Sequence, residues 1–121
     1  MNTSDFKGSP LAYLENRELS AVTFVRDYVQ LQFDGPFINA YVWPSIQISG
    51  RLFEKTSSSY RDVLCEQIGK NVVAAVVEPE SNISLHFEDE TIVAISLRDE
   101  DRVGPESAMF QDGTGKFWNV W

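Results

Sequence analysis

The sequence predicts an α+β fold: one domain of two repeats, each a short helix followed by a three-stranded meander, with a hairpin at the C-terminus. Three observations predict it. Short segments of alternating apolar residues are separated by turn residues, one segment has helical spacing, and the two halves of the chain share a pattern. The composition is 43% apolar and no Pro/Gly/Ser-rich linker occurs, so residues 1–121 are expected to form a single domain.

The first repeat is expected over residues 9–43. Ser9 is suited to cap a short helix that has Pro10 at its first position and ends near residue 15. The Asp34-Gly35-Pro36 segment has the composition of a turn. Strands are expected at residues 19–25, 28–33 and 37–43.

The second repeat is expected over residues 59–97. Ser59 and Asp62 have the spacing of a capping box, and Gly69 can end the helix in a left-handed conformation. The apolar residues between them recur at helical spacing, namely Tyr60, Val63, Leu64 and Ile68. Strands are expected at residues 71–77, 83–87 and 91–97.

The two repeats align with each other, which predicts an internal duplication. Residues 16–21 align with residues 69–74. Further on, the aligned apolar pairs are Val29 with Ile83, Leu31 with Leu85, Phe33 with Phe87, Ile38 with Ile92 and Ala40 with Ala94. Residues 98–121 follow as a C-terminal extension, in which the Asp112-Gly113-Thr114-Gly115 turn predicts the last hairpin.

Negative charge is concentrated in one stretch. The net charge is −8, and residues 78–106 hold nine acidic residues against Arg98 and Arg102. This balance disfavours nucleic acid and anionic membranes, which are bound by lysine and arginine. No apolar run approaches the ~20 residues of a membrane span, and residues 1–8 are polar and do not resemble a signal peptide, so we expect neither. With Cys65 as the one cysteine, we expect a cytoplasmic protein.

No segment carries a catalytic, cofactor or metal signature. His86 is the only histidine, so zinc-site spacing is absent, and no catalytic residue, metal or cofactor is predicted. One alternative is a small-ligand binder or hydrolytic enzyme that uses His86 together with the acidic loops. Strand alternation places His86 on the wetter face of its strand.

Aromatic residues follow the third strand of the first repeat. Alternation puts Tyr41 and Trp43 on the same face as Phe37 and Asn39, and Trp118 lies in the tail. Aromatic side chains among polar groups are enriched where proteins bind partners, but they also fill cores. Both interpretations remain open for this face.

The C-terminal segment Gly104-Pro105-Glu106-Ser107-Ala108-Met109-Phe110, with a turn and the terminal Trp121, resembles a pattern that ends small bacterial proteins. Some of these are immunity proteins of toxin systems. The resemblance implies an inhibitor that binds a toxin, and it assigns no catalytic residues.

The sequence therefore predicts a non-catalytic, acidic protein-binding domain, an immunity-like inhibitor of a basic partner. A third alternative is a homo-oligomeric structural protein, with a homodimer formed through the aromatic face. Acidic surfaces steer basic partners, and aromatic residues then anchor them. The predicted partner-binding residues are Tyr41, Trp43, Glu88, Asp89, Glu90, Asp99, Glu100, Asp101 and Trp118.

Overall fold

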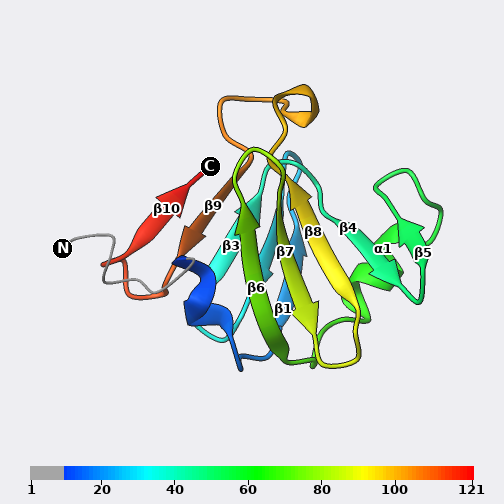
Figure 1. Cartoon of the computed structure of the whole chain (residues 1–121), viewed down its shortest axis with the longest axis horizontal. Coiled ribbons are helices and arrows are strands. Elements are labelled where there is room, and N and C mark those ends of the chain that lie inside the picture. Colours follow the sequence, from blue (N-terminus) through cyan, green and yellow to red (C-terminus); the bar gives the residue numbers. More distant parts are fainter. Residues whose placement is uncertain (1–9) are drawn as a thin grey trace.

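Two five-stranded antiparallel sheets make up the protein in the computed structural model, which describes residues 10–121 (Figure 1). The first sheet has the order β1 (Ala21–Phe24), β2 (Val29–Gln32), β3 (Phe37–Ala40), β9 (Ala108–Gln111) and β10 (Trp118–Val120). The second has the order β5 (Arg51–Phe53), β4 (Ser45–Ile48), β8 (Ile92–Ser96), β7 (Asn82–Phe87) and β6 (Val72–Glu78). The β9–β10 hairpin is present where the sequence predicts it.

The α+β prediction is wrong, because the described residues contain one six-residue α-helix, α1 (Tyr60–Cys65). Ser59 forms no side-chain cap, and Ile68 leaves 42% of its surface exposed, so the predicted apolar stripe ends early. In the first repeat the expected helix is the 3-10 segment η2 (Pro10–Leu14), and Ser9 lies outside the described residues. Such short helices gain little stability by themselves, and packing decides their length.

Strands β4 and β5 were not predicted. They form a hairpin whose two turn residues, Ser49 and Gly50, both have positive φ, at 50° and 80°. Such a two-residue turn matches the twist of antiparallel strands. The alternation in residues 45–48, followed by a Ser-Gly turn, is the sequence signal that could have found this hairpin.

Each half of the chain divides its strands between the sheets. Strands β1, β2 and β3 form a meander in the first sheet, and the β4–β5 hairpin then joins the second. Strands β6, β7 and β8 form a meander in the second sheet, and the β9–β10 hairpin returns to the first. Two crossovers make these passages: the first crossover is residues 41–44, and the second is residues 97–107, which contain η3 (Asp99–Asp101).

The halves meet around an approximate two-fold axis. Glu18 forms a β-bridge with Asn71, its counterpart 53 positions later in the predicted alignment. The Leu19 N–H donates to the Lys70 carbonyl (3.0 Å), and the Val72 N–H donates to the Arg17 carbonyl (2.9 Å), which is the same bond with the halves exchanged. The strand order is thus equivalent in both halves, while duplication of an ancestral segment stays a prediction.

The predicted alignment of the two repeats is one residue out of register at their third strands, β3 and β8. Leu31 lies opposite Ile38, whereas Leu85, the counterpart of Leu31, lies opposite Val93 rather than Ile92. The closing backbone bond encloses two residues at the β2–β3 turn, from the Phe33 N–H to the Pro36 carbonyl, but three at the β7–β8 turn, from the Phe87 N–H to the Thr91 carbonyl. Side chains after the longer turn therefore change face relative to the alignment. Val93 is accordingly buried in the core between the sheets, whereas Ile92 points outward.

The core contains apolar side chains from both meanders and both exchanged hairpins. Its fully buried strand residues include Val29, Leu31, Ile38, Ile46, Ile83, Leu85, Ile95 and Phe110. None of the helices in residues 10–121 is long and apolar enough to cross a membrane.

Candidate binding site

An open groove of about 900 Å³ lies where the two crossovers approach each other. The β1–β2 turn contributes residues 26–27, the first crossover and the start of β4 contribute residues 41–45, and the loop after β5 contributes residues 54–55. The second crossover forms another wall with Asp101 and residues 103–106. Outward residues of β8 also contribute to the lining. The groove therefore gathers five segments that are far apart in the sequence.

The groove brings together three of the nine predicted partner-binding residues, Tyr41, Trp43 and Asp101. Asp99 and Glu100 lie in a neighbouring depression of about 590 Å³. The other four lie elsewhere: Trp118 is on β10, and residues 88–90 form the β7–β8 turn at the other end of β8. The nine residues therefore do not form one surface.

Trp43 belongs both to the core and to the groove. Its half-buried ring packs on Tyr60, with the ring centroids 6.2 Å apart, and on Phe24 at 5.9 Å. The Tyr60 hydroxyl donates a hydrogen bond to the Pro44 carbonyl beneath the groove, and burial raises the pKa of that hydroxyl. Trp43 is therefore partly a core residue, and its remaining surface lines the groove.

Two cations lie against the same aromatic cluster. The Lys55 Nζ atom is 4.3 Å from the centroid of the Trp43 ring, and the Arg61 guanidinium lies 5.5 Å from it. The guanidinium is also 4.8 Å from the Phe24 ring. Cations are attracted to aromatic faces by the ring quadrupole. Two of the protein's own cations therefore already lie beside Trp43.

Carboxylates outnumber cations in the groove. Asp27, Glu54, Asp101 and Glu106 line it, against Arg26 and Lys55. Of these four carboxylates, only Asp101 is among the binding residues that the sequence predicts. The β4–β5 hairpin signal would have placed residues 54–55 beside the start of β4, and hence beside Trp43.

Two acidic residues of the second crossover form ion pairs within it, whereas Glu106 lines the groove. Glu100 forms an ion pair with Arg98, and Asp99 lies 3.5 Å from the Arg102 guanidinium. The hydrogen bond to Glu100 raises the pKa of Arg98. The Asp101 carboxylate accepts a hydrogen bond from the Ser96 Oγ atom (2.6 Å). These acids organise the crossover, so the cluster is less negative than the sequence suggests.

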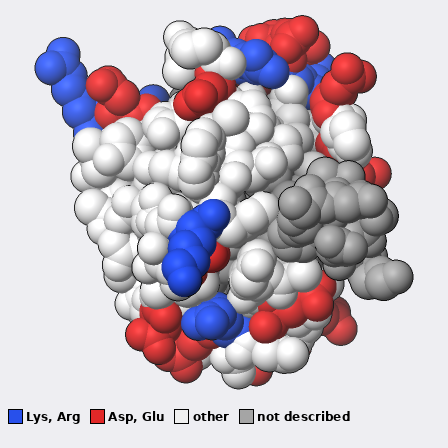
Figure 2. Space-filling view, turned by 90° about the vertical axis from the view of Figure 1, so that its left-hand side faces the viewer, with Lys and Arg blue, Asp and Glu red and all other residues white. Residues whose placement is uncertain are grey.

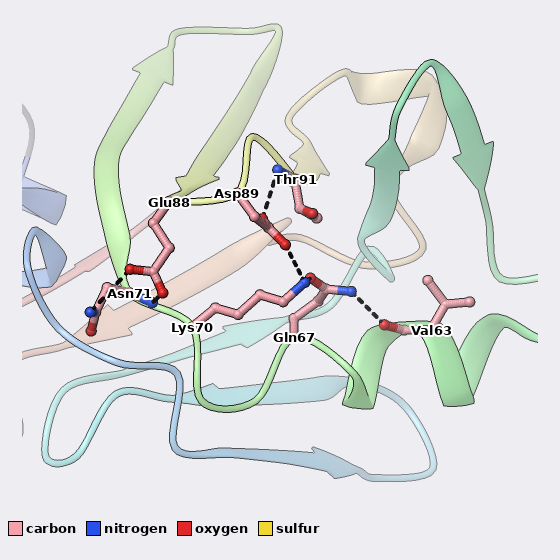
Figure 3. Close-up of polar contacts among 7 residues, drawn as sticks. All are labelled: Val63, Gln67, Lys70, Asn71, Glu88, Asp89 and Thr91. Carbon is pink, nitrogen blue, oxygen red and sulfur yellow. Dashed lines mark hydrogen bonds and ion pairs between the residues drawn. The ribbon is translucent and has the colours of Figure 1, made fainter.

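Figure 3 shows the same behaviour at the β7–β8 turn, where Lys70 reaches the Asp89 carboxylate with an Nζ–Oδ2 distance of 2.5 Å. The hydrogen bond from Lys70 lowers the pKa of Asp89 to about 2, and the Thr91 N–H also donates to it (3.1 Å). Glu88 accepts hydrogen bonds from Asn71. Both carboxylates thus connect the turn to the chain before β6.

His86 does not line the groove. It projects from the outer side of β7, where its Nε2 atom is 3.1 Å from the Ser84 Oγ atom. Within residues 10–121 no carboxylate forms a hydrogen bond with this imidazole, so the third member of a Ser–His–acid arrangement is not present there. The same residues contain no cluster of three potential metal ligands among His, Cys, Asp and Glu.

On the face drawn in Figure 2, most charged side chains gather toward the top and the bottom, and the surface between them is largely uncharged apart from a basic side chain near its middle. The outward side chains of the strands in the first sheet are also uncharged. Its outward residues are Ala21, Thr23, Gln30, Gln32, Phe37, Asn39, Met109, Gln111, Trp118 and Val120.

No protein-family model matches the chain, and no curated protein or solved structure matches it.

Proposed function

We propose that this protein is a non-catalytic binding domain that takes a positively charged segment of a partner protein into the groove between its crossovers. The observation that carries the proposal is the lining of the groove, where Tyr41 and Trp43 stand among four carboxylates and two cations. An arginine side chain suits this chemistry, because its planar guanidinium can stack on an aromatic ring while it pairs with a carboxylate.

The overall charge supports the same partner. A molecule with a net charge of −8 attracts a basic protein, and at physiological salt this attraction extends over a screening length of ~8 Å. Most of the acids at residues 88–89 and 99–101 are paired internally, so we assign the contact itself to the groove and only the long-range attraction to the whole surface. A toxin inhibitor, the class of protein that the C-terminal resemblance implies, would bind a basic toxin in this way.

The test uses an oligo-arginine peptide and follows its binding by isothermal titration calorimetry. The groove variant is Asp27→Asn with Glu106→Gln, and the matched control is Glu15→Gln with Glu90→Gln, which changes the net charge equally outside the groove. We expect the groove variant to weaken binding about tenfold or more, since hydrogen bonds to charged groups contribute about 1.5–3 kcal/mol. The control should change affinity less than about threefold, a surface effect.

Salt dependence and the aromatic wall sharpen this test. Affinity for the peptide should fall as salt rises, because the attraction is screened. Tyr41→Ala should weaken binding, whereas Tyr28→Ala should not, although the two rings pack together with centroids 5.6 Å apart. Tyr28 does not line the groove. Equal losses in the groove variant and its charge-matched control would show unspecific attraction and contradict the proposal.

A further inference from the structure

Strand β10 is an outer strand of the first sheet, and within residues 10–121 it pairs only with β9. The Trp121 N–H donates to the Ala108 carbonyl (2.9 Å), and the Asp112 N–H donates to the Phe117 carbonyl (3.1 Å). Residues 117 and 121 therefore face β9. Because backbone direction alternates along a strand, the N–H and C=O groups of Trp118 and Val120 face away from the sheet.

These outward groups lack strand partners. Among the described residues, the single bond to them is from the Asn119 Nδ2 atom to the Val120 carbonyl, at a length of 3.3 Å. The adjoining side chains are also uncovered: Trp118 is 60% exposed and Val120 is 39% exposed. The strand thus offers backbone hydrogen bonds and apolar surface at the same place.

The other outer strands are protected. Strand β6 has an irregular register between Val72 and Ala74, and residues 17–19 pair with the chain at its start. Strand β5 carries the exposed Arg51, and Arg61 lies over Phe24 of β1. Bulges, charges and covering segments are the usual means by which proteins prevent edge pairing. Strand β10 carries no charged residue.

We propose that two copies of this protein associate through β10, antiparallel and centred on Asn119. In this register Trp118 lies opposite Val120 of the second copy, and the pair occurs twice by symmetry. The outward N–H and C=O groups of both residues then exchange hydrogen bonds across the joint, and Asn119 Nδ2 releases the Val120 carbonyl. The two first sheets become one continuous sheet.

Charge favours a second copy at this edge. Two molecules of net charge −8 repel each other over most of their surface, but residues 107–121 hold only Asp112 and Lys116, whose charges cancel. A basic partner would instead be drawn to the acidic parts of the molecule. Because the joined strands have three residues each, the dimer is expected to be weak and to appear at high protein concentration. The proposal is independent of the function assigned to the groove.

The first test is sedimentation velocity over a concentration series. The wild type should shift from monomer to dimer as concentration rises, and Trp118→Lys should remain monomeric. Leu52→Lys is the matched control, because Leu52 is 55% exposed on β5, the corresponding outer strand of the second sheet. It should dimerise like the wild type. A wild type that stays monomeric throughout, or a Trp118→Lys variant that still dimerises, would overturn the proposal.

The second test checks the register by disulfide formation in a Cys65→Ser background, which removes the one native thiol. In this register Asn119 of one copy lies opposite Asn119 of the other, in a pair that exchanges no direct backbone hydrogen bonds. The two Cα atoms of such a pair are about 4.5 Å apart, a distance at which cysteine side chains can form a disulfide. Asn119→Cys should cross-link at least about tenfold faster than Gln111→Cys, which lies on β9 and away from the joint. Equal rates for the two variants would exclude this register.

Discussion

The two halves of the chain, residues 10–53 and 60–120, contain the same series of elements, and besides the register shift at the β7–β8 turn two further differences separate them. Each begins with a helical turn, forms a three-stranded meander and gives a hairpin to the opposite sheet. The first difference is buried: Leu14 in η2 corresponds to Gln67, 53 positions later, and neither side chain is exposed. The second is at the surface, where the first crossover has four residues and the second has eleven.

The surface difference is the one that builds the groove. A smaller depression, lined by the β6–β7 turn, the second crossover and Trp121, corresponds to the groove lined by the β1–β2 turn and the first crossover. Only the groove gains an additional wall, from the longer crossover. The equivalent parts of the halves therefore supply the core, and a departure from equivalence supplies the candidate site.

The largest expected effect tests the equivalence of the two cores. Leu31 and Leu85 occupy corresponding positions and are both fully buried. Leu31→Ala and Leu85→Ala should each cost about 2–5 kcal/mol of unfolding free energy, because each leaves a cavity. Urea denaturation followed by circular dichroism measures both. A cost below about 0.5 kcal/mol for either, the level of surface sites, would break the comparison.

The buried difference gives the next effect. Gln67 donates from Nε2 to the Val63 carbonyl (2.8 Å) and accepts from Lys70 (2.8 Å), so its amide is satisfied. Leu14→Gln would bury an amide among apolar neighbours and should cost about 1–3 kcal/mol. Gln67→Leu should cost less, about 1 kcal/mol, because Lys70 keeps Asp89 as a partner. The reverse order in urea denaturation would contradict this account.

A smaller effect depends on pH. Lys70 stabilises ionised Asp89 in the native state, so as pH falls the unfolded chain takes up the proton first, near its ordinary pKa of 3.8. The stability contributed by Asp89 is therefore present above about pH 4 and is lost as pH falls toward 2, the native pKa. Asp89→Asn should cost under about 1 kcal/mol at neutral pH, because the pair is partly exposed.

Denaturation at several pH values measures this effect. The difference between wild type and Asp89→Asn should disappear as pH falls from 4 toward 2. A difference that persists at pH 2 would mean that Asp89 acts by packing rather than by charge.

The smallest effect concerns the longer crossover. Glu100 and Arg98 are both more than half exposed, so Glu100→Gln should change the unfolding free energy by less than about 0.5 kcal/mol. Glu100 lies outside the groove, so affinity for the oligo-arginine peptide should also change little. A large loss of affinity in titration calorimetry would move the binding site from the groove to the neighbouring depression.

Local pattern was sufficient to predict six of the strands and the terminal hairpin. The third strand nevertheless ends at Ala40 rather than at residue 43, so Tyr41 and Trp43 lie in the first crossover and not on a strand face. Alternation placed Leu31 and Leu85 inward. The predicted alignment of residues 16–21 with residues 69–74 also matched Glu18 to Asn71, and the structure sets these two residues opposite each other. These features follow from the two-residue period of a strand and from turn chemistry, both of which are properties of neighbouring residues. The same local reasoning overestimated the helices, because a few apolar residues at helical spacing do not make a stable helix without a surface to cover.

Only the tertiary structure decided which sheet each hairpin joins. Alternation reports which side of a strand is apolar, but both sheets present an apolar side to the same core, so β4–β5 and β9–β10 would satisfy it in either sheet. The groove depends on that choice, since Trp43, Lys55 and Glu106 meet only after the crossovers exchange the hairpins. The sequence alone determined the inward side chains, and the packing of the two sheets determined which distant loops became neighbours.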